Sequence, residues 1–260
     1  MHTHSYNVLN IDIHILHARY VELGSWWQAD NICSPYTRIY MVTEGNGFLA
    51  WRDQKILMKP GYIYIIPAGL RFSFGCPDKL YKTFFHISIP TPDGYDLLEQ
   101  LNQCIVLHAS ERVGKITAAL AENSVKSMLE IKACLYSLIS QSLSESPPLQ
   151  IRKYSDYTTK IIQYVNQVQS ASLTVEAIAK ELFTSSSKLR NTFRHETGMT
   201  IGSYIHDRSL YYAELQVRCS TKSIKEISES LGYCDQFYFS RCFTRKFGLS
   251  PAKYRERLNI

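Results

Sequence analysis

Short runs of apolar residues, separated by turn-forming clusters, dominate the first third of the chain. From about Ile11 to Ile89, aromatic and β-branched residues alternate with polar residues or follow one another directly. Clusters rich in glycine, proline and charged residues interrupt these runs at positions 44–47, 52–53, 59–61, 67–69 and 75–78. Turns at this spacing are typical of an all-β barrel or sandwich. The pattern therefore predicts an N-terminal β-barrel.

After Gly94 the apolar period lengthens toward that of a helix, most clearly between residues 126 and 143. A polar stretch with Pro147-Pro148 cannot continue this helix and marks a domain boundary. We predict a first domain over residues 1–145, a linker over 146–156 and a second domain over 157–260. The second domain is expected to open with a helix from 157 to 168.

The second domain contains one pattern twice. Residues 178–205 and 227–255 align with an offset of 49 positions before an internal turn and 50 after it. The matching pairs are Ile178 with Ile227, Leu182 with Leu231, Phe193 with Phe243, Gly198 with Gly248 and Tyr204 with Tyr254. Each copy reads as a short helix, a turn, a capped second helix and a glycine stop. The repeat therefore predicts two helix-turn-helix motifs.

Each predicted second helix has an apolar inner face and a polar, basic outer face. In the first copy Ser185 is the expected cap, and Ser187, Lys188, Arg190, Asn191 and Arg194 point outward. In the second copy Asp235 is the expected cap, and Gln236, Ser240 and Arg241 point outward. Arginine paired with guanine and asparagine paired with adenine are efficient readers of the major groove. The outer faces are therefore candidate DNA-reading surfaces.

Charge and cysteine usage agree with a DNA-binding protein of a reducing compartment. Residues 155–260 hold 15 basic and 10 acidic residues, whereas residues 1–154 hold 14 and 13, so the net charge of +6 lies mainly on the repeat. The seven cysteines are scattered, without a C-x-x-C pair. No segment has the length of a membrane span, and the N-terminus lacks the features of a signal peptide. A cytoplasmic protein without membrane contact is expected.

The repeat resembles the AraC-type (arabinose-regulator-like) bacterial transcription factors, above all in GYCDQFYFSRCFTRKFGLSPAKYR at residues 232–255. The resemblance implies that a long helix, about 201–217, joins the motifs and that their second helices enter successive major grooves of double-stranded DNA. It implies base contacts by Ser187, Arg190, Asn191, Gln236, Ser240 and Arg241. Phosphate contacts are expected of Lys188, Arg194, Arg245 and Lys246, because lysine and arginine set affinity and salt dependence.

Two positions depart from the family pattern. Phe183 stands where the first turn usually has glycine, which is unfavourable if the backbone there needs a positive φ. A basic residue is common at the position of Asn191. The second motif is therefore expected to bind more strongly or to have diverged less.

The N-terminal half resembles a cupin, a double-stranded β-helix, in KPGYIYIIPAG, where Gly61, Pro67 and Gly69 fit the second cupin motif. Phe72 and Arg38 stand where metal-binding cupins have a histidine and a carboxylate. We therefore expect no metal, no cofactor and no catalytic residue, and interpret the barrel as a sensor for a small molecule. The candidate effector contacts are Trp26, Trp27, Arg38, Tyr40, Tyr64, Arg71 and His86.

By position, the helix at 126–143 resembles the family's dimerisation helix, with Met128, Ile131, Leu135 and Leu138 as candidate contacts in a homodimer. Packing of that helix on its own domain is an equal alternative. The whole chain is interpreted as a ligand-responsive regulator, with an activator of sugar-utilisation genes suggested by the resemblance and RNA polymerase as a further partner. Two alternatives stay open: a regulator without a small-molecule effector, and a cupin enzyme tethered to DNA.

Overall fold

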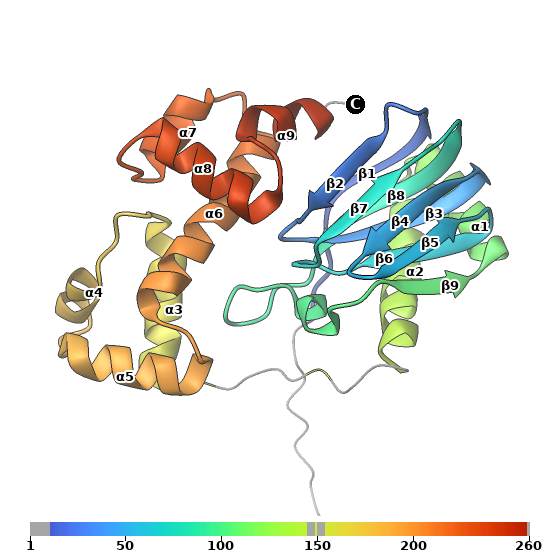
Figure 1. Ribbon diagram of the computed structural model, residues 1–260. Helices are drawn as coiled ribbons and strands as arrows, with labels where there is room; N and C mark the ends of the chain where they lie inside the picture. The colour runs from blue at the N-terminus through green and yellow to red at the C-terminus, as the bar shows by residue number, and fades with distance from the viewer. Residues whose placement is uncertain (1–10, 145–148, 150–153, 259–260) are drawn as a thin grey trace, which may run out of the picture.

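A computed structural model of the chain describes residues 11–144, 149 and 154–258. An N-terminal domain of two antiparallel sheets with two helices lies beside a C-terminal domain built of helices (Figure 1). The predicted fold class, an all-β N-terminal domain with trailing helices followed by an all-α domain, is confirmed, with the strands of the predicted barrel arranged as two sheets. Most of the predicted linker, 146–156, lies outside the described residues, so the predicted domain boundaries stay a prediction.

The N-terminal domain has a five-stranded sheet in the order β1-β8-β3-β6-β9 and a four-stranded sheet in the order β2-β7-β4-β5. Gly45 and Gly47 flank the tight turn between β3 and β4, which lie in different sheets. The strand bounds are β1 His14–Leu23, β2 Gln28–Ile32, β3 Thr37–Gly45, β4 Gly47–Trp51, β5 Gln54–Met58, β6 Tyr62–Ile66, β7 Phe72–Gly75, β8 Leu80–Ser88 and β9 Ile105–His108.

The alternation along β3 and β8 gives the larger sheet two different faces. Successive side chains of a strand point to opposite faces, so Ile39 and Met41 face one side while Arg38 and Tyr40 face the other. The first side joins a core with Phe85, Ile87 and the two helices. The second side meets the smaller sheet, and β3 and β8 place Arg38 opposite His86 and Tyr40 opposite Phe84. This inner face positions the cavity described below.

Two helices, α1 (Ser110–Glu122) and α2 (Val125–Ser144), cover the outer face of the larger sheet (Figure 1). Ile131, Leu135 and Leu138 have no exposed surface, because they pack into the core of their own domain. The prediction that these three residues form a dimer contact is therefore wrong. Met128 remains 39% exposed.

The sequence pattern also missed elements between the last long strand and α1. The helical period assigned from Gly94 onward is wrong at its start, since residues 97–101 form one short 3₁₀ helix and β9 pairs with β6. The 3₁₀ helix is capped by Asp96, whose side chain accepts a hydrogen bond from the Leu98 amide. Such short elements carry too few residues to show a period.

The C-terminal domain is arranged around the long helix α6 (Ile201–Cys219), which joins the two helix-turn-helix motifs (Figure 1). The predicted first helix is present as α3 (Asp156–Val168). The remaining helices are α4 (Val175–Glu181) and α5 (Ser186–Thr197) in the first motif, α7 (Ile224–Ser230) and α8 (Gln236–Phe247) in the second, and the final helix α9 (Pro251–Leu258).

Candidate DNA-binding surface and effector cavity

The first motif, residues 174–198, presents its predicted DNA-reading residues to solvent. Thr174 and Ser185 accept hydrogen bonds from the backbones of Ala177 and Lys188, and so cap α4 and α5. Leu189 and Phe193 are fully buried on the inner face of α5. The predicted contacts Ser187, Lys188, Arg190, Asn191 and Arg194 are all exposed on the opposite face.

Two basic side chains of the first motif already have partners on the protein. Arg190 forms an ion pair with Glu176 of α4, with 2.6 Å between Nη2 and Oε1. Both side chains are more than half exposed, so water screens the pair. The Lys188 ammonium lies 4.4 Å from the ring centre of Tyr157. A DNA phosphate or base would compete with these contacts.

The second motif, residues 223–248, has the same order of two capped helices around a turn, and its first helix has an additional capping interaction. Ser223 and Glu226 form a reciprocal capping box at the start of α7. The Asp235 side chain accepts from the Tyr238 amide at 2.7 Å and caps α8. Gln236, Arg241 and Arg245 are exposed and Ser240 is half-buried, all on α8.

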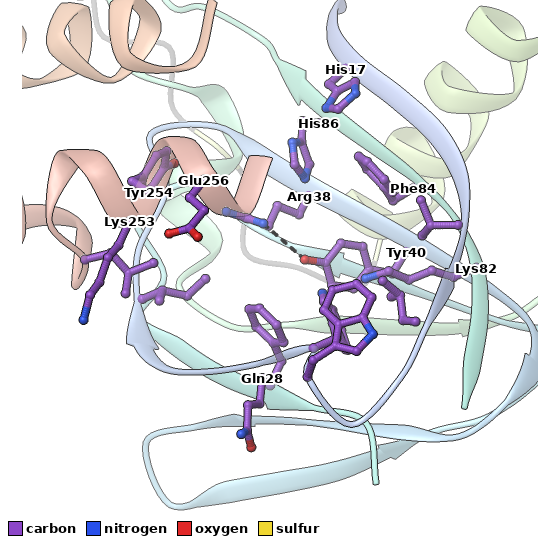
Figure 2. Close-up of a pocket in the computed structure, with 17 residues that line it drawn as sticks. His17, Gln28, Arg38, Tyr40, Lys82, Phe84, His86, Lys253, Tyr254 and Glu256 are labelled. Carbon is purple, nitrogen blue, oxygen red and sulfur yellow. Dashed lines mark hydrogen bonds between the residues drawn. The ribbon is translucent and has the colours of Figure 1, made fainter. Parts of the chain in front are cut away.

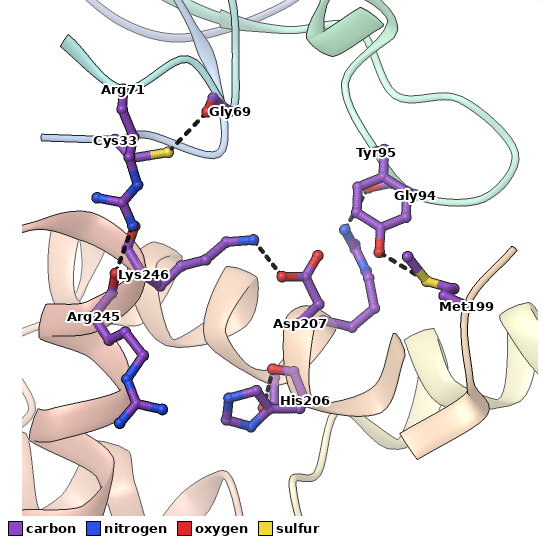
Figure 3. A network of polar contacts seen from close by, with 12 residues as sticks. Cys33, Gly69, Arg71, Gly94, Tyr95, Met199, His206, Asp207, Arg245 and Lys246 are labelled. Carbon is purple, nitrogen blue, oxygen red and sulfur yellow. Dashed lines mark hydrogen bonds and ion pairs between the residues drawn. The ribbon is translucent and has the colours of Figure 1, made fainter. Parts of the chain in front are cut away.

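Lys246 occupies a different environment from the other predicted phosphate contacts. Its ammonium is paired with Asp207 of α6, on the side of α8 that faces the N-terminal domain (Figure 3). A phosphate contact would require this pair to open. Arg194 and Arg245 have no such restriction on their exposed side chains.

One exposed residue of the reading surface was missed by the sequence analysis. The repeat offset of 50 after the turn pairs Ser187 with Phe237, not with Gln236. Phe237 lies in the first turn of α8 and is 78% exposed. It shares a helical face with Arg241, four residues later. Comparing the two copies position by position would have identified it.

The C-terminal end of α8 is docked on the N-terminal domain. The Arg71 guanidinium donates hydrogen bonds to the carbonyl oxygens of Arg245 (2.6 Å) and Lys246 (3.0 Å), as Figure 3 shows. The Cys33 amide donates to the Phe247 carbonyl oxygen at 3.2 Å. A side chain at Gly248 would meet the Asn31 carbonyl oxygen at 2.4 Å, so only glycine allows this approach.

The first motif and α6 touch the N-terminal domain through the loop before the 3₁₀ helix. The Tyr204 hydroxyl donates to the carbonyl oxygen of Asp93 at 2.7 Å. Arg208 of α6 donates to the Gly94 carbonyl oxygen, and the Tyr95 hydroxyl contacts the sulfur of Met199 at 3.6 Å. Tyr95 also packs against the buried cluster that contains Leu189 and Phe193, so the N-terminal domain contacts both motifs at separate points.

A cavity of about 500 Å³ opens between the two sheets and α9 (Figure 2). Its walls include the indole of Trp27, which packs on Phe74 with ring centres 4.2 Å apart. Residues from both domains line it: His17, Val21, Leu23, Trp26, Trp27, Gln28, Ile32, Arg38, Tyr40, Phe74, Lys82, Phe84 and His86 from the N-terminal domain, and Leu249, Lys253, Tyr254 and Glu256 from the C-terminal domain.

Five of the seven predicted effector contacts line this cavity: Trp26, Trp27, Arg38, Tyr40 and His86. Tyr64 and Arg71 do not. The Tyr64 hydroxyl is hydrogen-bonded to the backbone of Leu57 and Lys59, and Arg71 is engaged with α8. Lys82 was missed, because a lysine in an alternating strand is usually read as a solvent-facing residue. The three α9 residues could not be found, because they come from the other domain.

A buried polar network joins the cavity wall to α6 and α9. The Tyr254 hydroxyl of α9 lies 3.2 Å from the Tyr36 hydroxyl of the loop before β3 and donates to Glu214 of α6 at 3.1 Å. Glu214 is also paired with Arg218, at 3.2 Å. Burial raises the pKa of the Glu214 carboxyl, while Arg218 opposes that shift. The network therefore couples three elements from two domains.

The comparison with known proteins gives the family. A family model described as a helix-turn-helix domain matches residues 178–257. SoxS of Escherichia coli is 35% identical over 98 residues, which make up 38% of this chain and 92% of SoxS. The chain belongs to the AraC-type family of transcription regulators. It is a DNA-binding regulator of transcription and not an enzyme.

Longer similarities extend over both domains of this AraC-type regulator. The Msm operon regulatory protein of Streptococcus mutans is 28% identical and covers 85% of this chain and 84% of that protein. The activator RhaR of Mannheimia succiniciproducens is 26% identical, with 85% of each chain covered. The crystal structure of ToxT from Vibrio cholerae superposes with a TM-score of 0.61 over 93% of this chain and 97% of ToxT, at 15% identity, which shows a shared two-domain fold. Among the helices described here, none is long and apolar enough to cross a bilayer.

Proposed function

We propose that this AraC-type protein is a ligand-responsive activator, whose effector binds in the cavity between the sheets and α9. The carrying observation is that residues of both domains line one cavity. A ligand can shift an equilibrium only if it binds one arrangement better than another. A molecule that touches Trp27 of the sensor and Tyr254 of the DNA-binding domain meets this condition, because movement of α9 changes its contacts.

The names of the relatives support a role in carbohydrate utilisation. Besides the Msm operon protein and RhaR, the chain is similar to the lactose operon transcription activator of Staphylococcus xylosus, which is 21% identical over 239 residues. Each similarity covers about 85% of this chain. We therefore propose that this protein acts in the cytoplasm and that its target genes serve sugar uptake or breakdown. Activation involves contact with RNA polymerase.

The proposed DNA contacts follow from exposure on α5 and α8. Ser187, Arg190 and Asn191 of α5 are proposed to read one major groove, and Gln236, Ser240 and Arg241 of α8 the next. Successive grooves on one face of DNA are about 34 Å apart. Lys188, Arg194 and Arg245 are proposed to hold phosphates. Homodimerisation through a surface other than the buried face of α2 would bring four reading helices to one operator.

Selection of binding sites from random duplex DNA, followed by footprinting with the full chain, tests the DNA-binding proposal. Two protected segments about one helical turn apart are expected for each chain. Thermal shifts of the full chain against mono- and oligosaccharides and their acidic derivatives then test effector binding. A ligand that stabilises the protein must also change its affinity for the selected operator.

A regulator without an effector is the second candidate, since aromatic side chains such as Tyr40, Phe74 and Phe84 already fill much of the space between the sheets. Under that alternative, ligands leave both the melting midpoint and the operator affinity unchanged, while DNA alone stabilises the protein. That outcome would replace the effector part of the proposal and leave the DNA-binding part intact.

A further inference from the structure

Three basic side chains gather on the inner wall of the cavity. Arg38 on β3 and Lys82 and His86 on β8 project from the same face of the larger sheet (Figure 2). Their residues are 8%, 2% and 4% exposed, so each is more than nine-tenths buried. Buried cations are normally paired with an acidic group.

Lys82 has no acidic partner in the described part of the chain. Its ammonium lies 3.2 Å from the ring centre of Tyr40 and 3.7 Å from that of Trp27, and no hydrogen bond or ion pair is formed to it there. Burial lowers the pKa of Lys82 well below its ordinary value, and the charge of Arg38 lowers it further. Aromatic faces attract a cation but do not neutralise it.

Arg38 and His86 also lack an acidic hydrogen-bond partner among the described residues. Every hydrogen bond of the Arg38 side chain goes to a neutral hydroxyl group, on Ser34, Tyr36 or Tyr40. The His86 Nδ1 atom is buried without a partner among the described residues. Burial, followed by the charges of Arg38 and His17, lowers the pKa of His86 well below its ordinary value.

Acidic groups that line the cavity do not balance these charges. Of the described residues that line it, Glu256 alone is acidic, and it lies exposed on α9 close in sequence to Lys253, whose charge opposes it. The buried Glu214 behind Tyr254 is already paired with Arg218, and burial raises the pKa of its carboxyl although the charges of Arg218 and Arg38 oppose that shift. Burial of basic groups without acidic partners is unfavourable, because the charged groups lose their hydration. An anionic ligand that enters the cavity would offset this loss.

We propose that the effector carries a doubly charged acidic group of the phosphate monoester class, held by Arg38, Lys82 and His86. Its compact body packs against Trp27 and Phe74. This inference rests on the proposed function, because it assigns a ligand class to the proposed effector cavity. Two negative charges match the fixed charge of Arg38 and a protonated Lys82, whereas a monocarboxylate leaves one cation uncompensated. Guanidinium and ammonium groups are also common phosphate ligands in proteins.

Matched probe sets test the charge of the ligand in the full-length protein. Glucose, glucuronate and glucose 6-phosphate form one set; galactose, galacturonate and galactose 6-phosphate form another; inorganic phosphate and decanoate complete the panel. We expect the melting midpoint to rise with phosphate monoesters more than with the matched uronate or neutral sugar. Titration calorimetry of any binding phosphate ester in buffers of different ionisation enthalpy should show proton uptake, because the anion stabilises the charged forms of Lys82 and His86.

The direction of the pH effect follows from the same groups. The pKa values of Lys82 and His86 are lowered in the empty cavity, so binding of the anion raises them and tightens as the pH falls toward about 6. Below that pH the phosphate ester takes up a proton and loses its second negative charge, so binding weakens again. The ionisable groups facing Lys82 and His86 are Arg38 on β3, His17 on β1, Cys76 after β7, Arg218 on α6, and Lys253 and Glu256 on α9. Of these, Arg38 and Arg218 keep their charge at every pH of the experiment.

A variant tests the site without knowledge of the natural ligand. Lys82→Met removes a buried cation that lacks an acidic partner, so the ligand-free melting midpoint should rise. The same change should weaken binding of a phosphate ester roughly tenfold or more. Lys55→Met is the matched control, because Lys55 also lies over an aromatic ring, Phe48 at 4.3 Å, but is exposed. It should change neither quantity.

Several outcomes overturn the proposal. Neutral sugars or monocarboxylates that stabilise the protein as strongly as phosphate esters would exclude a site for a doubly charged group, and so would a panel in which no phosphate compound gives a shift. A lower melting midpoint for Lys82→Met, together with an unchanged ligand response, would show that the lysine is structural. Binding of a phosphate ester that leaves operator affinity unchanged would refute the proposed function and leave the proposed anion-binding site intact.

Discussion

The two helix-turn-helix motifs share a sequence pattern but differ in the interactions that stabilise their helices and turns. In the second motif a capping box begins α7, Gly232 forms the turn with φ of 71°, and the end of α8 is docked on the N-terminal domain. In the first motif the turn residue at the same position is Phe183, with φ of 49°. The left-handed conformation costs a residue with a side chain about 1–2 kcal/mol. The second motif therefore holds its geometry with less strain.

The charges beside the reading helices differ as well. Glu176 of the first motif pairs with Arg190, whereas the equivalent position of the second motif is Lys225. A carboxylate near DNA repels phosphates and occupies a basic side chain, while a lysine attracts them. Both differences favour the second motif as the stronger DNA contact, in agreement with the sequence-based expectation.

Replacement of the reading arginines should show this difference most directly. Arg241→Ala is expected to weaken binding to the selected operator by about 1–3 kcal/mol and to relax preference at one base pair. Arg190→Ala should cost less, because Arg190 loses its contact with Glu176 when DNA binds. Quantitative gel shifts on operators with single substitutions measure both. Equal losses on all sequences would assign Arg241 to the phosphates.

The turns provide the next test. Gly232→Ala should lower the free energy of unfolding by about 2 kcal/mol, because the left-handed conformation disfavours alanine. The added carbon would also meet the Ser170 hydroxyl at 2.3 Å. Urea denaturation of the variant measures the loss. Gly202→Ala is the control, since an added carbon there meets no atom within 4 Å; a similar loss in both variants would contradict the explanation.

Phe237 allows a test at the level of a single methyl group. Its exposed ring on α8 is suited to contact the methyl group of a thymine, which is worth about 1 kcal/mol. Replacing thymine by uracil at one position of the second half-site should therefore weaken the wild-type protein about fivefold. Phe237→Ala should make the protein insensitive to that replacement. A variant that still distinguishes thymine from uracil at every position would exclude the contact.

A smaller effect of opposite sign is expected at the first turn. Phe183 is 97% exposed, so Phe183→Gly removes little packing while it relieves the left-handed strain. After the flexibility of glycine in the unfolded chain is subtracted, we expect a gain of about 0.5 kcal/mol. Thermal unfolding of the full chain is the measurement. A lower midpoint would mean that the exposed ring has a partner in the folded protein.

An effect of similar size is expected at Glu176. Glu176→Gln frees Arg190 and removes a negative charge, so DNA affinity should rise by a factor of about two to five, because exposed ion pairs contribute about 0–1 kcal/mol. Glu181→Gln makes the same change of charge on the exposed end of α4, at a residue outside the ion pairs of the described chain. If both variants gain equally, general repulsion and not the pair with Arg190 is responsible.

The helical half was predictable in detail because its signals are local. Caps such as Ser185 and Asp235, stops such as Gly198 and the repeat itself determine helix bounds within a few residues. The sheet domain was predictable only in class. The inner position of Lys82 depends on strand register, and the role of Tyr254 depends on a contact 218 residues away, with Tyr36. Neither leaves a periodic signal, and the buried face of α2 could not be told from a dimer face without the sheet that covers it.

The hydrogen bond between Tyr36 and Tyr254 also constrains how this regulator could be recombined or redesigned. Fusion of its DNA-binding domain to an unrelated sensor would expose Tyr254 and open the surroundings of Glu214 to water, so a carboxyl now held above its ordinary pKa would ionise more readily. A chimera that preserves the present arrangement needs a hydroxyl group where Tyr36 supplies one. The two domains are therefore expected to change together in evolution at these positions, and random domain exchange should yield folded proteins that have lost their response.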